Sequence, residues 1–85
     1  MIVHASCIAY RGRGLLILGP SGAGKSTLAL EMMAFGAALV ADDRTVLRTE
    51  GERLIADSPD AIRGRIEARG VGILRARAHG PVPLV

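Results

Sequence analysis

The sequence predicts a single α/β domain, and three observations lead to this fold class. Two short apolar runs, Leu15–Leu18 and Ala38–Ala41, have the character of buried strands. Between them, residues 25–35 place apolar side chains at helical spacing after a loop rich in glycine. A chain of 85 residues is long enough for one small domain only, since domains usually span about 100–150 residues. We therefore treat residues 1–85 as one unit.

The N-terminal part predicts two strands. Residues 1–9 begin with apolar and β-branched side chains and predict a strand, and a turn punctuated by glycine follows at residues 10–14. Leu15–Leu18 is a continuous apolar run of the kind found in strands that are buried on both faces.

A helix is expected from Lys25 to Phe35, after a loop at residues 19–24. Its apolar face is expected to contain three side chains at positions i, i+4 and i+7, namely Leu28, Met32 and Phe35. Gly36 is the expected C-terminal stop of this helix.

The second half of the chain continues with strands. Ala38–Ala41 predicts a second buried strand, and residues 45–49 and 53–56 predict a hairpin around Glu50-Gly-Glu52. A turn is predicted at Asp57–Asp60, and a glycine-interrupted strand or loop at Ile62–Leu74. Gly80–Val85 returns to apolar residues. Because the chain stops while it enters a strand, the domain is expected to be incomplete at its C-terminal end.

Composition argues against several function classes. Tyr10 and Phe35 are the only aromatic residues, which leaves no stacking platform for single-stranded nucleic acid. The ten arginines are spread without a block, so the net charge of +3 indicates an ordinary surface rather than a nucleic-acid groove. We expect no membrane partner, because the longest uncharged run, residues 14–24, has 11 residues and the N-terminus does not resemble a signal peptide. The lone Cys7 excludes an internal disulfide and predicts a cytoplasmic location.

Residues 19–26, Gly-Pro-Ser-Gly-Ala-Gly-Lys-Ser, match the phosphate-binding pattern G-x-x-x-x-G-K-[ST] in full. Glycines let backbone N–H groups converge on phosphate oxygens, and the start of the helix adds the positive end of its dipole. Lys25 is expected to contact the β- and γ-phosphates, and the Ser26 hydroxyl to bind Mg²⁺. The alternative is a glycine-rich turn with an incidental lysine, although this lysine is the only one in the chain. The predicted nucleotide-binding residues are Gly19, Pro20, Ser21, Gly22, Ala23, Gly24, Lys25, Ser26 and Thr27.

Asp42 and Asp43 follow an apolar strand at its carboxyl end, where ligands of α/β sheets usually bind. Beside a phosphate-binding loop, one carboxylate could hold Mg²⁺ while the other takes a proton from an attacking hydroxyl. The alternative is a polar turn, in which aspartate is common.

Two further positions have a structural interpretation on the residues alone. His4 lies in an apolar strand, where a histidine is more often structural than catalytic. On a strand, Glu67 and Arg69 would share a face as an exposed ion pair, worth less than about 1 kcal/mol. Gly70 and Gly72 indicate a bend or a close backbone approach.

Three segments together resemble the HPr kinase/phosphorylase family, in the short alphaproteobacterial form that lacks an N-terminal domain. They are Val3-His4-Ala5 through the phosphate-binding loop, Leu39-Val-Ala-Asp-Asp43, and Ile66-Glu-Ala-Arg-Gly-Val-Gly-Ile73. The third segment is similar to the family's Glu-Ile/Val-Arg-Gly-Leu/Val-Gly-Ile signature, with Ala68 at the variable apolar place. The resemblance covers nearly the whole chain.

The resemblance implies a bifunctional enzyme that phosphorylates a serine of the phosphocarrier protein HPr with ATP. It implies the reverse step as well, a phosphorolysis with inorganic phosphate that yields pyrophosphate, and a role in regulating the phosphotransferase system. The implied fold is a P-loop kinase core with a mixed sheet, similar to the nucleotide-binding core of phosphoenolpyruvate carboxykinase. Family members form hexamers and continue past Val85 into a further catalytic arginine, a phosphorolysis loop and helices that help to dock HPr.

The resemblance also implies roles for single residues. Active-site positions are matched by His4, Lys25 and Asp43, of which Asp43 would accept the proton in phosphorylation and return it in the reverse reaction. The Mg²⁺-binding region is matched by Ser26, Asp42 and Glu67. Residues 66–75 match the segment that serves both directions.

Other functions remain open from the residues themselves. Another P-loop enzyme, such as a small-molecule kinase or an NTPase, would share the phosphate-binding loop but not the signature at residues 66–73. A nucleotide-sensing module would bind ATP with Mg²⁺ and transfer no phosphoryl group. Nucleic-acid binding through the arginines is the most distant alternative.

Overall fold

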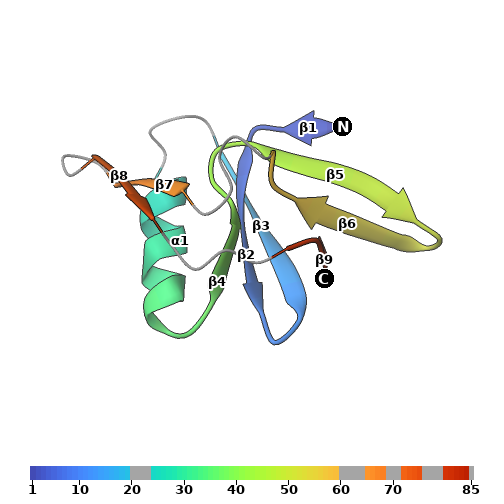
Figure 1. The fold of residues 1–85 in the computed structure, drawn as a ribbon, viewed down its shortest axis with the longest axis horizontal. Coiled ribbons are helices and arrows are strands. Elements are labelled where there is room, and N and C mark those ends of the chain that lie inside the picture. The colour runs from blue at the N-terminus through green and yellow to red at the C-terminus, as the bar shows by residue number, and fades with distance from the viewer. Residues whose placement is uncertain (20–23, 60–64, 69–71, 76–79, 85) are drawn as a thin grey trace.

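The computed structural model describes residues 1–19, 24–59 and 80–84 in full, and the backbone of residues 65–68 and 72–75. Within these residues the chain forms one helix and nine strands (Figure 1). The helix is α1 (Lys25–Ala34), and the strands are β1 (Ile2–Val3), β2 (Ala5–Tyr10), β3 (Arg13–Leu18), β4 (Ala38–Ala41), β5 (Thr45–Glu50), β6 (Arg53–Asp57), β7 (Arg65–Ala68), β8 (Gly72–Arg75) and β9 (Val82–Pro83).

The central sheet has the strand order β3-β2-β4. β2 is antiparallel to both neighbours, so β3 and β4 point in the same direction. Consequently the ends of β3 and β4 and the start of β2 lie at one edge of the sheet. An isolated parallel bridge joins Gly14 of β3 to Leu84, on the side of β3 away from β2. The predicted α/β class with antiparallel neighbours is therefore confirmed, and all strand pairs of the described sheets are antiparallel.

α1 begins at Lys25, as predicted, and ends one residue earlier than predicted. Gly36 has a φ of 106°, in the left-handed region, and its N–H donates to the carbonyl of Met33 at 3.0 Å. The N–H of Ala37 donates to the carbonyl of Met32 at 3.2 Å. Because these bonds satisfy carbonyl groups of the last turn, the predicted stop at Gly36 is confirmed. α1, the helix in the described part of the chain, is too short to cross a bilayer.

The predicted apolar face of α1 is wrong. Leu28 and Phe35 are 44% and 84% exposed, whereas Ala29 is fully buried. Lys25 is buried too, and it lies one helical turn before Ala29 on the same face. The helix is therefore rotated so that its first turn directs the lysine inward. Spacing alone did not show this rotation, because Met32 lies at helical spacing both from Leu28 and from Ala29. It packs against the core, as the predicted face also required.

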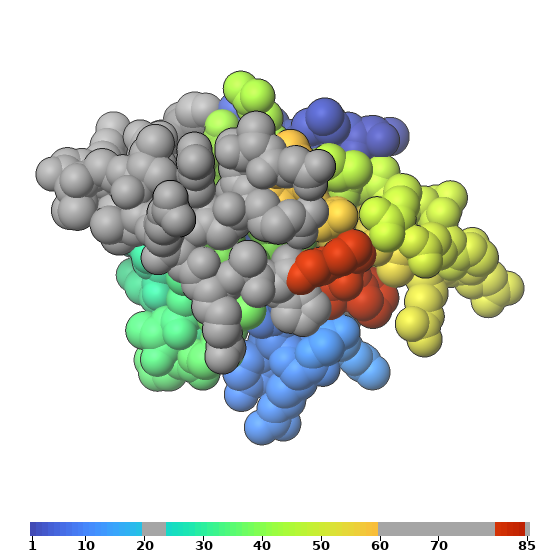
Figure 2. Space-filling view, in the orientation of Figure 1, coloured from blue at the N-terminus to red at the C-terminus, as the bar shows by residue number. Residues whose placement is uncertain are grey.

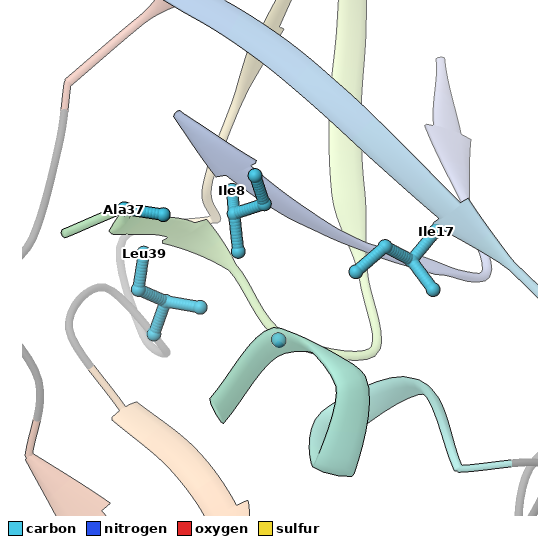
Figure 3. Close-up of a cluster of buried hydrophobic side chains, with 5 residues drawn as sticks. Ile8, Ile17, Ala37 and Leu39 are labelled. Carbon is cyan, nitrogen blue, oxygen red and sulfur yellow. The ribbon is translucent and has the colours of Figure 1, made fainter. Parts of the chain in front are cut away.

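One core lies between α1 and the central sheet (Figure 3). Its buried residues come from β2, β3, α1 and β4 together with the residue before β4: Ile8, Ile17, Ala29, Leu39 and Ala37. Partly buried side chains of α1 pack against it, namely Leu30, Met32 and Met33. The small Ala29 lets the helix approach the sheet closely, which holds the start of α1 at the sheet edge.

The prediction that Leu15–Leu18 is buried on both faces is wrong. Ile17 is 8% exposed, but Leu15 and Leu18 are 44% and 70% exposed. In the described part of the chain β3 is an outer strand of its sheet. Ile17 packs on the α1 side and Leu16 against the second sheet, whereas Leu15 and Leu18 have no such cover. A short apolar run does not distinguish an outer strand from a central one.

A second sheet, with the order β1-β5-β6-β9, has antiparallel neighbours throughout. It meets the face of the central sheet opposite α1 through a second cluster of buried side chains, Cys7, Ala9, Val40, Ala56 and Val82. Leu84 joins the two sheets, since its N–H donates to the carbonyl of Leu54 at 2.9 Å and it bridges to Gly14. Figure 2 shows this C-terminal segment in red between the blue β2–β3 hairpin and the yellow-green β5–β6 hairpin.

The predicted hairpin is confirmed as β5 and β6, in which Glu50 pairs with Arg53 around Gly51 at a φ of 62°. The strand predicted over residues 1–9 is divided at His4, because β1 pairs with β5 whereas β2 belongs to the central sheet. The chain therefore crosses from one sheet to the other at His4.

Residues 62–74, predicted as strand or loop, include β7 and all of β8 except its last residue, Arg75, and the two strands pair in an antiparallel manner. Of the turn predicted at residues 57–60, Asp57 ends β6 and accepts a hydrogen bond from the N–H of Ser58 at 2.8 Å. Asp60 lies outside the described residues.

Candidate functional site

The topology brings segments that are distant in sequence to one edge of the central sheet. His4 directly precedes β2, Gly19 follows β3, and Asp42 follows β4. Because β2 is antiparallel to β3 and β4, its start lies beside their ends. Residues predicted for phosphate binding, metal binding and proton transfer are therefore neighbours.

The phosphate-binding motif is described at its two ends. Gly19 and Gly24 have φ values of 148° and 92°, in the region that favours glycine. Lys25 is only 6% exposed, and its Nζ donates to the carbonyl of Gly19 at 2.7 Å. Thr27, the last residue of the predicted set, is exposed, and residues 20–23 lie outside the described residues. The lysine thus joins the start of α1 to the end of β3.

Asp42 is a buried carboxylate, 7% exposed, that accepts hydrogen bonds from two hydroxyl groups. Its Oδ1 lies 2.7 Å from Ser26 Oγ and 2.9 Å from Ser6 Oγ. Ser26 belongs to the first turn of α1 and Ser6 to β2, so the carboxylate connects the helix to the sheet. Such donors are needed, because a buried carboxylate without partners is costly.

Asp43 occupies a strained backbone corner. Its φ of 68° lies in the left-handed region, which is uncommon for residues other than glycine. The N–H of Arg44 donates to the carbonyl of Asp42 at 2.8 Å, which closes a three-residue turn centred on Asp43. The N–H of Asp43 donates to Ser6 Oγ at 3.1 Å. Strain of this kind is often found at functional sites.

The side chain of Asp43 pairs with His4. Nε2 of His4 lies 2.7 Å from Oδ1 of Asp43, and the two side chains are 55% and 51% exposed. Solvent and a substrate can therefore reach this pair, in contrast to the buried Asp42. The two adjacent aspartates thus have different environments, one held by hydroxyl groups and one beside an imidazole.

The structure brings together part of the predicted metal-binding set. Ser26 and Asp42 are in contact, whereas only the backbone of Glu67 is described, on β7 beside α1 (Figure 1). The side chain of Glu67, and Arg69 altogether, lie outside the described residues. Among the described side chains no three His, Cys, Asp or Glu residues gather as a metal site.

Ser6 is the site residue that the sequence analysis missed. Its signal was a small polar residue inside an apolar run, on the same strand face as Ile8. Its contacts with Asp42 and Asp43 depend on how β2 and β4 are paired, which a single sequence does not show. The neighbouring Cys7 is buried, which raises the pKa of its thiol to about 11 and argues against a role as a nucleophile.

P-loop domains, which bind nucleotide phosphates, have a strand, then a glycine-rich motif with a lysine, then a helix. This chain has that order, and a carboxylate at the end of the next strand, Asp42, contacts the first turn of the helix. The chain belongs to the family described as HPr Serine kinase C-terminal domain, whose family model matches residues 1–80. The resemblance inferred from the sequence segments is confirmed. Membership in a kinase family implies the use of a nucleotide and a metal ion.

Curated relatives include the HPr kinase/phosphorylases of Caldicellulosiruptor bescii, 46% identical over 72 residues, and Bacillus cytotoxicus, 47% identical over 73 residues. These matches cover 84% and 85% of this chain but 23% and 24% of the relatives, so the chain spans about a quarter of their length. The solved structure of the HPr(Ser) kinase/phosphatase from Coxiella burnetii is similar with a TM-score of 0.91 and 28% identity. That similarity covers 99% of this chain and 61% of the other.

Proposed function

We propose that this chain is the nucleotide- and metal-binding part of a serine kinase/phosphorylase that acts on an HPr-type phosphocarrier protein. The observation that carries the proposal is the position of Asp42, whose carboxylate lies 2.7 Å from the Ser26 hydroxyl of the phosphate-binding motif. Relatives named HPr kinase/phosphorylase support HPr as the substrate and regulation of the phosphotransferase system as the role.

ATP is the proposed nucleotide, with its phosphates on residues 19–27. Lys25 supports this placement, because its buried Nζ already lies against the Gly19 carbonyl, 2.7 Å away, and can exchange that partner for a phosphate oxygen. The N-cap of α1 is Gly24, which offers no side-chain cap, so a bound anion can take up first-turn N–H groups.

The residues also fit Mg²⁺. This ion prefers oxygen ligands and usually takes one or two carboxylates from the protein, with water and substrate phosphates completing its coordination. Ser26 and Asp42 offer a hydroxyl and a buried carboxylate in contact, and Glu67 would join them from β7. When bound, the ion neutralises charge on the phosphates.

Asp43 is the proposed proton acceptor, since its carboxylate is half exposed and lies next to the metal-binding Asp42. In phosphorylation, the serine oxygen of HPr bonds to the γ-phosphorus of ATP, the bond to the ADP oxygen breaks, and the serine proton passes to Asp43. In phosphorolysis, inorganic phosphate takes the phosphoryl group as pyrophosphate, and Asp43 returns the proton to the serine oxygen. His4 would orient the Asp43 carboxylate through Nε2, 2.7 Å away.

The test is a transfer assay with purified HPr, ATP and Mg²⁺, in which mass spectrometry locates phosphoserine. The proposal expects phosphorylation of one HPr serine, and release of pyrophosphate when inorganic phosphate is added to the product. Calorimetric binding of ATP without transfer would favour a nucleotide-sensing module, and ATP hydrolysis without labelled HPr would favour another P-loop enzyme. Either result would overturn the proposed function.

A further inference from the structure

Ser6 contacts both aspartates of the candidate site through one hydroxyl group. Its side chain is fully buried. Ser6 Oγ donates to Oδ1 of Asp42 at 2.9 Å and accepts from the N–H of Asp43 at 3.1 Å. One side chain therefore holds a carboxylate and the following peptide group at the same time.

An irregularity in the pairing of β2 with β4 makes these contacts possible. Ile8 of β2 pairs with Leu39 of β4, but the preceding Cys7 pairs with Ala41. The pairing therefore skips one residue of β4, which is a β-bulge. A register shift of one residue moves the side chains beyond it to the opposite face of the sheet.

The shifted register, continued by one residue, places Ser6 opposite Asp42, in agreement with their 2.9 Å hydrogen bond. Without the bulge Ser6 would lie opposite Ala41, and the Asp42 side chain would point to the other face. Ser6 shares its face with Ile8, which packs against α1. The bulge therefore directs Asp42 to the side on which the first turn of α1 carries Ser26.

We propose that Ser6 is a positioning residue of the transfer reaction. It holds the Asp42 carboxylate towards Ser26 while it fixes the peptide of Asp43 in its left-handed conformation. Asp42 is the carboxylate proposed to hold the cation, and Asp43 is the one proposed to accept the proton. Ser6 therefore fixes the position of these two residues relative to each other. This inference rests on the proposed function, because it assigns Ser6 to the same site.

The hydroxyl of Ser6 has a specific part when a cation is bound. Ser26 would then direct an oxygen lone pair to the cation while its O–H still donates to Asp42. The hydroxyl of Ser6 would be a second donor to the same carboxylate oxygen, from the sheet side, and would keep the carboxylate from rotating. Residues that orient a metal ligand in this way usually change metal affinity or activity when they are replaced.

The experiment compares Ser6→Ala with Ser6→Thr, which retains the hydroxyl, and with Cys7→Ala as a matched control. Cys7 is also fully buried on β2, but it points to the opposite face and contacts neither aspartate. Ser6→Ala is expected to lower kcat for HPr phosphorylation about 10- to 100-fold. At saturating Mg²⁺ the KM for ATP is expected to stay within about twofold, because the phosphate loop is untouched. Thermal unfolding is recorded for each variant.

Hydrogen exchange of the Asp43 amide, followed by NMR, gives a readout that does not need activity. Ser6→Ala should make this amide exchange at least about tenfold faster, because it loses its acceptor, while Cys7→Ala should leave it unchanged. Should Ser6→Thr fold, it should retain the slow exchange and most of kcat. A kcat for Ser6→Ala within about twofold of wild type, or an equal loss in Cys7→Ala, would overturn the inference.

The two proposals can fail separately. If wild-type protein does not phosphorylate HPr, the proposed function fails and Ser6 is judged on two measurements alone. These are the protection of the Asp43 amide from exchange, which Ser6→Ala should reduce, and the Mg²⁺ concentration needed for half of the gain in ATP affinity, which it should raise. If neither differs from Cys7→Ala, Ser6 is a structural serine only.

Discussion

The hydroxyl oxygen of Ser26 and Oδ1 of Asp42 lie 2.7 Å apart, although 16 positions separate the residues in the sequence. Ser26 belongs to the first turn of α1, and Asp42 follows β4. The chain leaves the sheet at the end of β3, crosses α1 and returns through β4 to the same edge. This contact is the basis of the proposed cation site, and four predictions follow from it and from the surrounding fold.

Replacement of Asp43 by asparagine should separate binding from transfer. An amide cannot accept the serine proton, so phosphoryl transfer should fall about 10²- to 10⁴-fold. Asparagine tolerates the left-handed φ of 68°, so the fold and the affinity for ATP should be retained. Transfer to HPr and calorimetric titration with ATP and Mg²⁺ measure the two effects. Turnover close to wild type would refute the role given to Asp43.

Lys25→Met should weaken ATP binding. Loss of a charge-assisted hydrogen bond to phosphate, worth about 1.5–3 kcal/mol, corresponds to about 10- to 100-fold in affinity. Arg53→Met is a suitable control, because it removes a positive charge from an exposed position on β6, outside the site. Calorimetry should show weak binding for the lysine variant only. Equal losses in both variants would point to net charge rather than a direct contact.

Stability should fall at alkaline pH because of Cys7. Burial raises the pKa of its thiol from 9.0 to about 11, so the unfolded chain ionises first. The contribution of this group is fully present below about pH 9 and is lost as the pH rises through about 11, up to about 3 kcal/mol. Urea unfolding from pH 8 to 11 should show a steeper loss for wild type than for Cys7→Ala. Parallel curves would contradict this prediction.

Gly14→Ala should destabilise the junction of the two sheets. An added Cβ would lie 2.8 Å from Val82 Cγ1 and 3.1 Å from Leu84 Cδ2, so the C-terminal strand would have to shift. The free energy of unfolding should fall by about 1–3 kcal/mol in urea titrations. At Gly80, an added Cβ would have no neighbour within 4 Å, so Gly80→Ala should change stability by less than about 0.5 kcal/mol. Comparable losses in both variants would mean that contact with β9 is not the cause.

Several elements could be predicted because their signals are local. Gly36 ends α1 through its own left-handed backbone, and the hairpin turn at Gly51 depends on the two strands beside it. The phosphate-binding motif is contiguous, so its lysine and serine could be recognised without a fold. The family resemblance also rests on short contiguous segments, so it could be recognised without a fold. The family model confirms it over residues 1–80.

The errors concern burial, which depends on neighbours that come from elsewhere in the chain. Leu28 and Phe35 were expected in the core, but the inward rotation of Lys25 leaves them exposed. Leu18 resembles a buried strand residue by its neighbours in sequence, yet it lies on an outer strand. Apolar character alone does not show which face of an element another element covers.

The residues by themselves predict a phosphate-binding motif, a pair of adjacent aspartates beside it, and the family that these segments resemble. The family resemblance implies separate roles for Asp42 and Asp43, but only the tertiary structure shows that the two carboxylates have different environments. A bulge between β2 and β4 directs Asp42 inward to Ser6 and Ser26, and the strained turn leaves Asp43 outside beside His4. The physical reason is that a shift of one residue in strand pairing reverses the face to which a side chain points.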